Sequence, residues 1–185
     1  MIKIATAECF TQGKIGRELH ALAQSYDGKF GCEYINPKDY GNFDFSDVSV
    51  TCSLFIPTIE AVEKILNVKN PPKPDKLIKG IKVYDEKGDK AVSKIMAQAV
   101  KNLSDCDIAI GTTAGVGRGG ITIITEEYEI TTTTDVYADL CQNNSEILFQ
   151  RSENGIKKAL ELTLLVLNNQ IDKIESLENI EIKKK

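Results

Sequence analysis

The chain has 185 residues, 42% of them hydrophobic, and its 23 basic and 27 acidic side chains give a formal net charge of -4. This length and hydrophobic content suit one domain with a substantial core, and the charge balance gives no reason to expect a nucleic-acid or anionic-membrane partner. The longest apolar run, residues 162–167, is too short to cross a bilayer, and no export signal precedes the first predicted strand, so we expect a cytoplasmic protein with a small or compact substrate.

Strands and helices alternate through the first half of the chain. Apolar and β-branched runs predict strands, apolar residues three and four apart predict helices, and clustered prolines predict a loop. The predicted elements are, in order, a strand from Ile2 to Ala7, a helix at residues 13–26, a turn at 26–32 that leads into a short strand, a strand at 46–56, a helix from Pro57 to about Val68 with a Glu60–Lys64 pair, and a loop at 70–75.

The second half keeps this alternation and adds a β-rich segment. The predicted elements are a strand at residues 80–85, a helix at 89–103, a buried strand at 106–111, strands at 121–125 and 128–137 that form a hairpin, a short strand at 146–151, a closing helix at 154–169 capped at Ser152, and a solvated tail at 183–185. We therefore predict an α/β fold: a single domain, residues 1–170, with a mixed β-sheet flanked by helices and a β-hairpin excursion, and a C-terminal tail or short appended element at 171–185.

Five cysteines are spread irregularly along the chain: Cys9, Cys32, Cys52, Cys106 and Cys141. Their odd number and wide spacing predict free thiols in a reducing compartment, and the sequence has no cysteine–histidine cluster that would predict a metal site. The last four follow apolar or strand-like patterns and are expected in the core. Cys9 differs because it lies in the polar turn between the first strand and the first helix.

The turn around Cys9 suits a reactive thiol. Backbone N–H groups without intrahelical partners and the positive end of a helix dipole both stabilise a thiolate. Lys14 and Arg17 would add positive charge there. Thr11 and Glu8 are further candidates for ligand binding, although a neighbouring carboxylate also opposes thiolate formation. The same position equally suits a small buried hydrophobe.

The segment GTTAGVGRGG, residues 111–120, contains the spacing G-x-G-x-x-G. A strand pattern follows it, whereas a dinucleotide fingerprint opens a helix, and Ile121 stands where a P-loop needs lysine, so both of these nucleotide sites are excluded. Exposed N–H groups, hydroxyls and a guanidinium nevertheless suit a phosphate. The candidate contacts are Thr112, Thr113, Gly115, Gly117 and Arg118. Alternatively, the glycines only permit a tight connection into the hairpin.

The segments IATAECFTQGKIGRELHALAQ and GTTAGVGRGG together resemble the HcgF proteins, a family of hydrogenotrophic methanogens that acts in biosynthesis of the guanylylpyridinol cofactor of Fe-hydrogenase. The resemblance extends over nearly the full chain and is most specific in the Ala-Glu-Cys-Phe-Thr segment. It implies that the protein binds guanylylpyridinol as its substrate and joins the carboxymethyl group of this ligand to Cys9 as a thioester. No cofactor of its own is expected.

A free carboxylate is a poor electrophile, so thioester formation requires prior activation of the carboxymethyl group. The resemblance implies that an adenylating partner enzyme, similar to ubiquitin-activating proteins, supplies an acyl adenylate, from which Cys9 would displace AMP. We expect the guanosine phosphate to rest on residues 112–120 while the carboxymethyl arm reaches Cys9, because both segments follow strands and can meet at one end of the sheet.

Two other functions stay open. In one, a non-catalytic module carries a nucleotide-like ligand and Cys9 is structural. In the other, a cysteine hydrolase cleaves a nucleotide-linked amide or ester, although His20, the only histidine, lies about 10 Å along the helix and is too far from Cys9 for a direct dyad. The strand order is not predicted, and the sequence leaves open whether the chain forms a homodimer.

Overall fold

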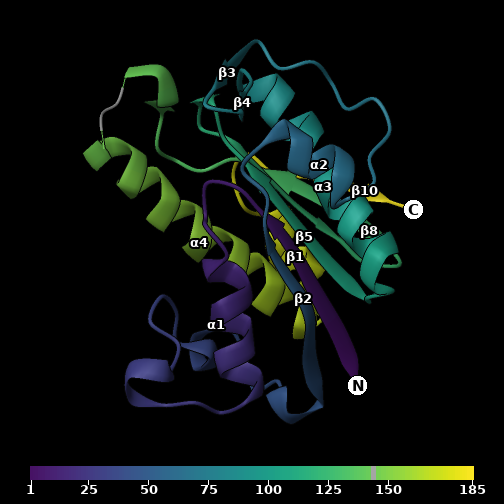
Figure 1. Cartoon of the computed structure of the whole chain (residues 1–185). Coiled ribbons are helices and arrows are strands. Elements are labelled where there is room, and N and C mark those ends of the chain that lie inside the picture. Colours follow the sequence, from purple (N-terminus) through teal and green to yellow (C-terminus); the bar gives the residue numbers. More distant parts are fainter. Residues whose placement is uncertain (143–144) are drawn as a thin grey trace.

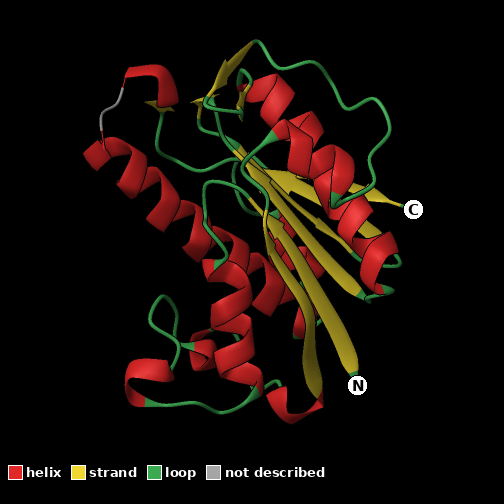
Figure 2. Ribbon diagram, in the orientation of Figure 1, coloured by secondary structure: helices red, strands yellow, loops and turns green. Residues whose placement is uncertain are grey.

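Helices cover both faces of one central sheet, which gives the protein three layers (Figure 1). The structure is a computed structural model that describes residues 1–142 and 145–185. Figure 2 shows the strands gathered at the centre with the long helices outside them. Alternating strands and helices thus form the α/β fold that the sequence predicts.

The central sheet has six strands in the order β10-β8-β7-β5-β1-β2. β1, β2 and β5 run parallel, whereas β7, β8 and β10 pair antiparallel with their neighbours. The strands are β1 (Ile2–Glu8), β2 (Val48–Phe55), β5 (Ile108–Thr113), β7 (Gly120–Ile124), β8 (Tyr128–Thr132) and β10 (Glu181–Lys184). The mixed sheet is confirmed, and the predicted hairpin extends this sheet as β7 and β8, although β8 ends at Thr132 and the strand predicted to reach residue 137 is too long.

In the described ranges 1–142 and 145–185, the helices around the sheet are α1 (Lys14–Ala23), α2 (Ile59–Lys64), α3 (Glu86–Ser104), α4 (Ser145–Leu167) and α5 (Ile171–Glu175). One core lies between the sheet and α1 with α4, where Ile15 and Leu19 meet Ile156 and Leu160. Leu162–Leu167 falls at the end of α4. Of the helices described, none is both long enough and apolar enough to cross a membrane.

The second core lies between the opposite face of the sheet and α2 with α3. α3 presents Val92, Met96 and Val100 at intervals of four residues, so these side chains form one buried stripe. Asp85 caps this helix by accepting a hydrogen bond from the Gly88 N–H at 2.7 Å. The stripe holds α3 across β5 and β7, behind the glycine-rich segment.

Short elements join the main ones. They are the two-stranded pairs β3 (Lys76–Ile78) with β4 (Ile81–Val83) and β6 (Val116–Gly117) with β9 (Ala138–Asp139), and the 3-10 helices η1 (Gly28–Phe30), η2 (Pro37–Asp39), η3 (Phe45–Asp47) and η4 (Leu140–Gln142). The predicted Glu60–Lys64 pair forms at 2.6 Å on the exposed face of α2.

Residues 146–151 are helical, so the predicted short strand is wrong. α4 begins at Ser145, and Ser152 lies inside the helix instead of capping it. The segment is amphipathic at helical spacing, and its continuation packs against the start of the chain. At Gly155 an added Cβ would lie 2.5 Å from the Phe10 ring, so glycine lets α4 approach the turn that carries Cys9.

The short strand predicted after the turn at 26–32 is also wrong, because this segment continues through η1 and η2. The buried carboxylate of Glu18 in α1 explains the irregular backbone. It accepts hydrogen bonds from the Cys32 thiol at 2.8 Å, the Glu33 N–H at 2.7 Å and the Tyr34 N–H at 3.0 Å. Backbone donors that a strand would use are thus bonded to a side chain.

The C-terminal lysines belong to the sheet. Ile182 of β10 pairs with Ile130 of β8, so the solvated tail predicted at 183–185 is wrong as to backbone structure, although the Lys183 and Lys184 side chains are exposed. Lysines on an edge strand oppose pairing with another chain.

Candidate functional site

A pocket of about 430 Å³ opens where the three parallel strands end. Cys9 follows β1, Pro57 follows β2 and Ala114 follows β5, and all three residues line it. Ligands of open α/β sheets bind in this position, outside the carboxyl ends of the strands. Its volume is that of a small-molecule site.

The pocket wall is apolar and carries positive charge. The residues that line it are Cys9, Phe10, Gln12, Lys14, Phe55, Pro57, Ile81, Ala114, Leu140, Ser145, Leu148, Phe149, Arg151 and Ser152. Two of them are cations and none is an acid, although the chain as a whole has a net charge of -4. Among the residues described here, the site therefore suits an anionic ligand with apolar surface.

Cys9 is held at the bottom of a tight turn and is 7% exposed. Its N–H donates to the Thr112 carbonyl at 3.0 Å, which ties the end of β1 to β5. The chain then reverses through Gln12 at φ 55° and Gly13 at φ 79°, both left-handed, before α1 begins. Gly13 suits this conformation because it lacks a Cβ.

Glu8 occupies the helix N-terminus that the sequence assigned to the thiol. Its carboxylate is fully buried and accepts hydrogen bonds from the Ile15 N–H at 3.1 Å and the Gly16 N–H at 2.9 Å. Hydroxyls of Thr6 and Thr11 donate to it at 2.8 and 2.7 Å. The expectation of unpartnered N–H groups beside Cys9 is therefore wrong for these two donors of α1, because a carboxylate already neutralises them.

The predicted contacts in the first turn separate into two groups. Lys14 lies on the pocket wall, where its ammonium donates to the Tyr34 hydroxyl at 2.8 Å and lies 5.8 Å from the Phe149 ring centre. The hydrogen bond to Tyr34 raises the pKa of Lys14 above its ordinary value. Arg17 turns away and pairs with Glu18 and Glu33 at 2.5 and 3.3 Å.

Thr11 and Thr112 are buried beside the turn and support it. Their hydroxyls lie 2.9 Å apart, and Thr11 also donates to Glu8. Thr113 is buried as well, and its hydroxyl has no hydrogen-bond partner among the described residues. None of these three threonines is among the described residues that line the pocket.

The glycine-rich segment uses its polar groups internally. The Gly115 N–H donates to Asp89 at 2.7 Å, and the Val116 N–H donates to the Tyr84 carbonyl at 2.8 Å. Arg118 donates its N–H and two guanidinium nitrogens to Glu86 at 2.8 to 3.2 Å. The segment enters β7 as predicted, and only its Ala114 lines the Cys9 pocket.

Arg151 of α4 lines the pocket and was missed from the sequence. It is 1% exposed, and the negative charge of a Cys9 thiolate is among the effects that raise its pKa against the lowering effect of burial. The sequence analysis missed Arg151 because it predicted a strand, and not a helix, for residues 146–151. Read as one helix from Ser145, the segment places Leu148, Arg151 and Ser152 on a single face, the face that packs toward the sheet.

Lys82 is a second buried cation that the sequence did not reveal. Its ammonium donates to the Ile56 carbonyl at 2.8 Å and the Pro57 carbonyl at 3.3 Å. It thereby fixes the chain just after β2, on the pocket wall. Nothing in the strand pattern around it distinguishes a buried lysine from an exposed one.

Asp89 of α3 is a buried acid beneath the glycine-rich segment. Its Oδ2 accepts from Gly115, whereas Oδ1 has no partner within the described chain. Burial raises the pKa of Asp89 to about 7, against the lowering effects of the Gly115 N–H, Arg151 and Lys82. At neutral pH this carboxyl is therefore protonated in part.

We expect Asp89 to make stability fall as pH rises from about 4 to 7. Over this range the folded state keeps a proton that the unfolded chain, with the ordinary pKa of 3.8, has lost, so the free energy of unfolding decreases with pH. Asp89→Asn cannot titrate and should remove this decrease. Urea unfolding at a series of pH values measures it, and an identical pH dependence in Asp89→Asn would contradict the assignment.

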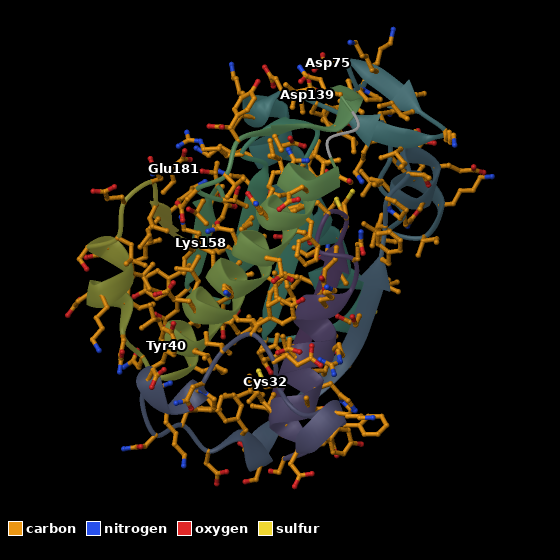
Figure 3. The ribbon with its side chains drawn as sticks, turned by 90° about the vertical axis from the view of Figure 1, so that its left-hand side faces the viewer. Cys32, Tyr40, Asp75, Asp139, Lys158 and Glu181 are labelled. Atoms are coloured by element: carbon orange, nitrogen blue, oxygen red, sulfur yellow. The ribbon has the colours of Figure 1, made fainter. Side chains whose placement is uncertain are left out.

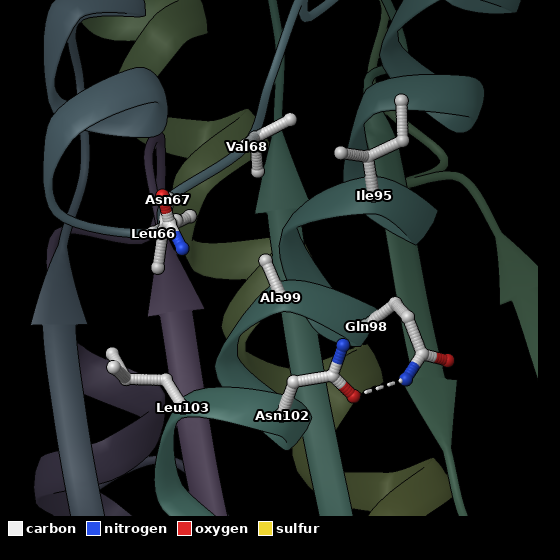
Figure 4. Close-up of a pocket in the computed structure, with 8 residues that line it drawn as sticks. All are labelled: Leu66, Asn67, Val68, Ile95, Gln98, Ala99, Asn102 and Leu103. Carbon is white, nitrogen blue, oxygen red and sulfur yellow. Dashed lines mark hydrogen bonds between the residues drawn. The ribbon is translucent and has the colours of Figure 1, made fainter.

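Another hollow lies away from the Cys9 pocket. It has a volume of about 520 Å³, lies between the end of α2 and α3, and is lined by eight residues without an ionisable side chain. Two of them, Gln98 and Asn102, share a hydrogen bond of 2.8 Å (Figure 4).

All five cysteines are free. Cys32 lies beside α1, toward the opposite end of the molecule from Asp139 (Figure 3). Cys106 is buried as predicted, whereas Cys32, Cys52 and Cys141 are half-buried.

The fold and the pocket define an α/β protein with a thiol-containing pocket at the carboxyl edge of its sheet. Residues 1–167 match the family model described as FeGP cofactor biosynthesis protein HcgF. The chain therefore belongs to the HcgF family of methanogens, as the resemblance of its first segment and glycine-rich segment indicated.

Relatives of similar length support this assignment. A UPF0254 protein of Methanothermobacter thermautotrophicus strain Delta H is 41% identical over 162 residues, which cover 88% of this chain and 96% of the relative. A UPF0254 protein of Methanococcus aeolicus is 43% identical over 171 residues, 92% of this chain and 98% of the relative. One from Methanopyrus kandleri is 38% identical over 182 residues, 98% and 96%.

Proposed function

We propose that the protein binds guanylylpyridinol in the Cys9 pocket and forms a thioester between the carboxymethyl carbonyl of this ligand and Cys9. The observation that carries the proposal is the coincidence of a thiol, two cations and an apolar wall in one pocket of about 430 Å³. Membership of a family that acts in FeGP cofactor biosynthesis supplies the ligand class.

The covalent step needs an activated acyl group. In an adenylating partner enzyme, the carboxylate attacks the α-phosphate of ATP, which forms the acyl adenylate and releases pyrophosphate. Cys9 loses its proton to solvent, its sulfur attacks the acyl carbon, and the bond to the adenylate oxygen breaks, so AMP leaves with the electron pair. The product keeps the acyl group reactive for a later acceptor. Incubation with guanylylpyridinol, the partner and ATP should leave one ligand covalently bound per chain.

The structure favours Lys14 over the glycine-rich segment as the contact for the anionic part of the ligand. The amides of Gly115, Val116 and Arg118 already have acceptors, which does not support placing the guanosine phosphate on residues 112–120. Lys14 lies on the wall beside Phe149, whose ring is 57% exposed and offers a planar surface for an aromatic ring.

Removing the charge of Lys14 is expected to weaken noncovalent binding. Lys14→Met should raise the Kd for guanylylpyridinol about tenfold, because a partly exposed charge-assisted contact contributes about 1 to 1.5 kcal/mol. Isothermal titration in a Cys9→Ala background measures this without covalent capture.

The matched control is Lys158→Met, which removes a lysine of α4 that pairs with Asp135 and does not line the pocket. Its Kd should stay within about twofold of the parent value. Equal affinities for the Lys14 and Lys158 variants would remove Lys14 from the ligand site.

A further inference from the structure

Arg151 brings a buried positive charge to the wall of the Cys9 pocket. Its two terminal nitrogens donate to backbone carbonyl oxygens. The acceptors are Ala114 at 3.4 Å, Gly115 at 3.1 Å, Gly117 at 2.8 Å and Ala138 at 2.9 Å. Neutral carbonyl groups orient a guanidinium and reduce its desolvation cost, but they do not cancel its charge. The positive charge therefore remains available to an anion in the pocket.

The third nitrogen of Arg151 is an unused donor. Nε is buried and has no hydrogen-bond partner among the described residues. A buried donor without an acceptor costs free energy and calls for an explanation such as a bound polar or anionic group. Nε is therefore an unpaired, buried donor of a side chain that lines the same pocket as Cys9.

Contacts of Phe10 hold the turn that carries Cys9 against α4. The Phe10 ring, next in the chain to Cys9, has its centre 5.9 Å from the Arg151 guanidinium carbon. Ser152, next to Arg151, donates its hydroxyl to the Phe10 carbonyl at 2.8 Å. Gly155 allows the ring to lie against the helix. The turn that carries Cys9 thus packs against the segment of α4 that carries Arg151.

Burial and the charges of neighbouring residues have opposite effects on the pKa of Arg151. Burial lowers its pKa, and the negative charges of Asp89, a Cys9 thiolate and Asp139 raise it. Burial also raises the pKa of Asp89 to about 7, so at neutral pH this acid neutralises the guanidinium only in part. Lys82, like Arg151, lowers the pKa of Asp89.

Two more charged groups flank Cys9. Lys14 lies on the pocket wall, and the Glu8 carboxylate is engaged by the N-terminus of α1.

We propose that Arg151 is a positioning residue for Cys9, whose guanidinium stabilises the thiolate in the pocket before it attacks an acyl group. The thiol proton goes to solvent, and no bond forms to the arginine. This inference rests on the proposed function only in taking Cys9 as the reactive thiol.

The test is the pH dependence of Cys9 alkylation by iodoacetamide in the full chain, followed by peptide mass spectrometry. Only the thiolate reacts, so the rate rises with pH through a midpoint. Arg151→Met should move this midpoint upward, because the variant lacks the positive charge that shares the pocket with Cys9. Arg151→Lys keeps the charge, so its midpoint should stay close to that of the wild type. Lys158→Met should leave the midpoint unchanged.

Asp89→Asn supplies a second test in case Arg151→Met does not fold. It removes an acid that competes for Arg151, so the alkylation midpoint should move to lower pH. Unchanged midpoints in Asp89→Asn and in any folded Arg151 variant would overturn the inference. This readout needs no guanylylpyridinol, so it separates failure of the positioning role from failure of thioester formation.

Discussion

Glu8→Ala is expected to lower the free energy of unfolding by about 3 to 5 kcal/mol, which is the usual cost of leaving a buried polar network without its charged partner. The carboxylate is fully buried and accepts four hydrogen bonds, two from hydroxyls and two from the first turn of α1. Alanine leaves all four donors without this acceptor and removes the negative charge at the helix N-terminus. For a chain of this size the melting temperature should fall by about 10 °C or more.

Denaturant unfolding of two further variants makes this result specific. Glu8→Gln keeps the shape and one acceptor oxygen, so it should lose less stability than Glu8→Ala. Glu127→Ala removes an exposed glutamate of the β7–β8 connection and should change the free energy of unfolding by less than about 0.5 kcal/mol. If Glu8→Ala were as stable as Glu127→Ala, the carboxylate would not be what holds the Cys9 turn to α1.

Cys9→Ala is expected to abolish covalent capture of guanylylpyridinol while leaving the noncovalent Kd within about threefold. The thiol contributes one small, nearly buried side chain to a pocket whose charge and apolar surface come from other residues. Losing the nucleophile removes the chemistry without removing these contacts. Mass spectrometry of tryptic peptides after incubation with the adenylating partner and ATP measures the loss.

Cys52→Ala is the matched control, because Cys52 is half-buried on β2 and does not line the pocket. This variant should keep the full yield of adduct on Cys9. An adduct that persists in Cys9→Ala would place the chemistry on another residue. A wild-type protein that binds the ligand and never forms an adduct would favour the alternative function, a non-catalytic carrier in which Cys9 is structural.

The sequence predicts the part of the site that local pattern controls. Strand, turn and helix from Ile2 onward place Cys9 at the carboxyl end of β1, and the strand predicted after Gly120 is confirmed as β7, where a dinucleotide fingerprint would open a helix. Period and turn chemistry are local properties, so one sequence suffices to read them. The parallel pairing of β1 with β2 and β5 then brings Cys9, Pro57 and Ala114 to the same edge of the sheet.

The direction in which a charged side chain turns depends on distant partners, and the sequence does not contain that information locally. Lys14 and Arg17 share the first turns of α1, yet Lys14 faces the pocket and Arg17 pairs with Glu33. Arg118 looked suited to a phosphate and instead pairs with Glu86, 32 positions earlier. Arg151 was hidden because a short apolar run fits a strand as well as one turn of a long helix.

The most direct test of the account is the intact mass of the wild-type protein after incubation with guanylylpyridinol, the adenylating partner and ATP, before and after hydroxylamine. We predict a mass increase equal to the ligand less one water, present only with the partner and ATP and removed by hydroxylamine, as for a thioester. An unchanged mass in a protein that binds the ligand, or an adduct that resists hydroxylamine, would contradict the assignment of Cys9 as the acyl-accepting thiol.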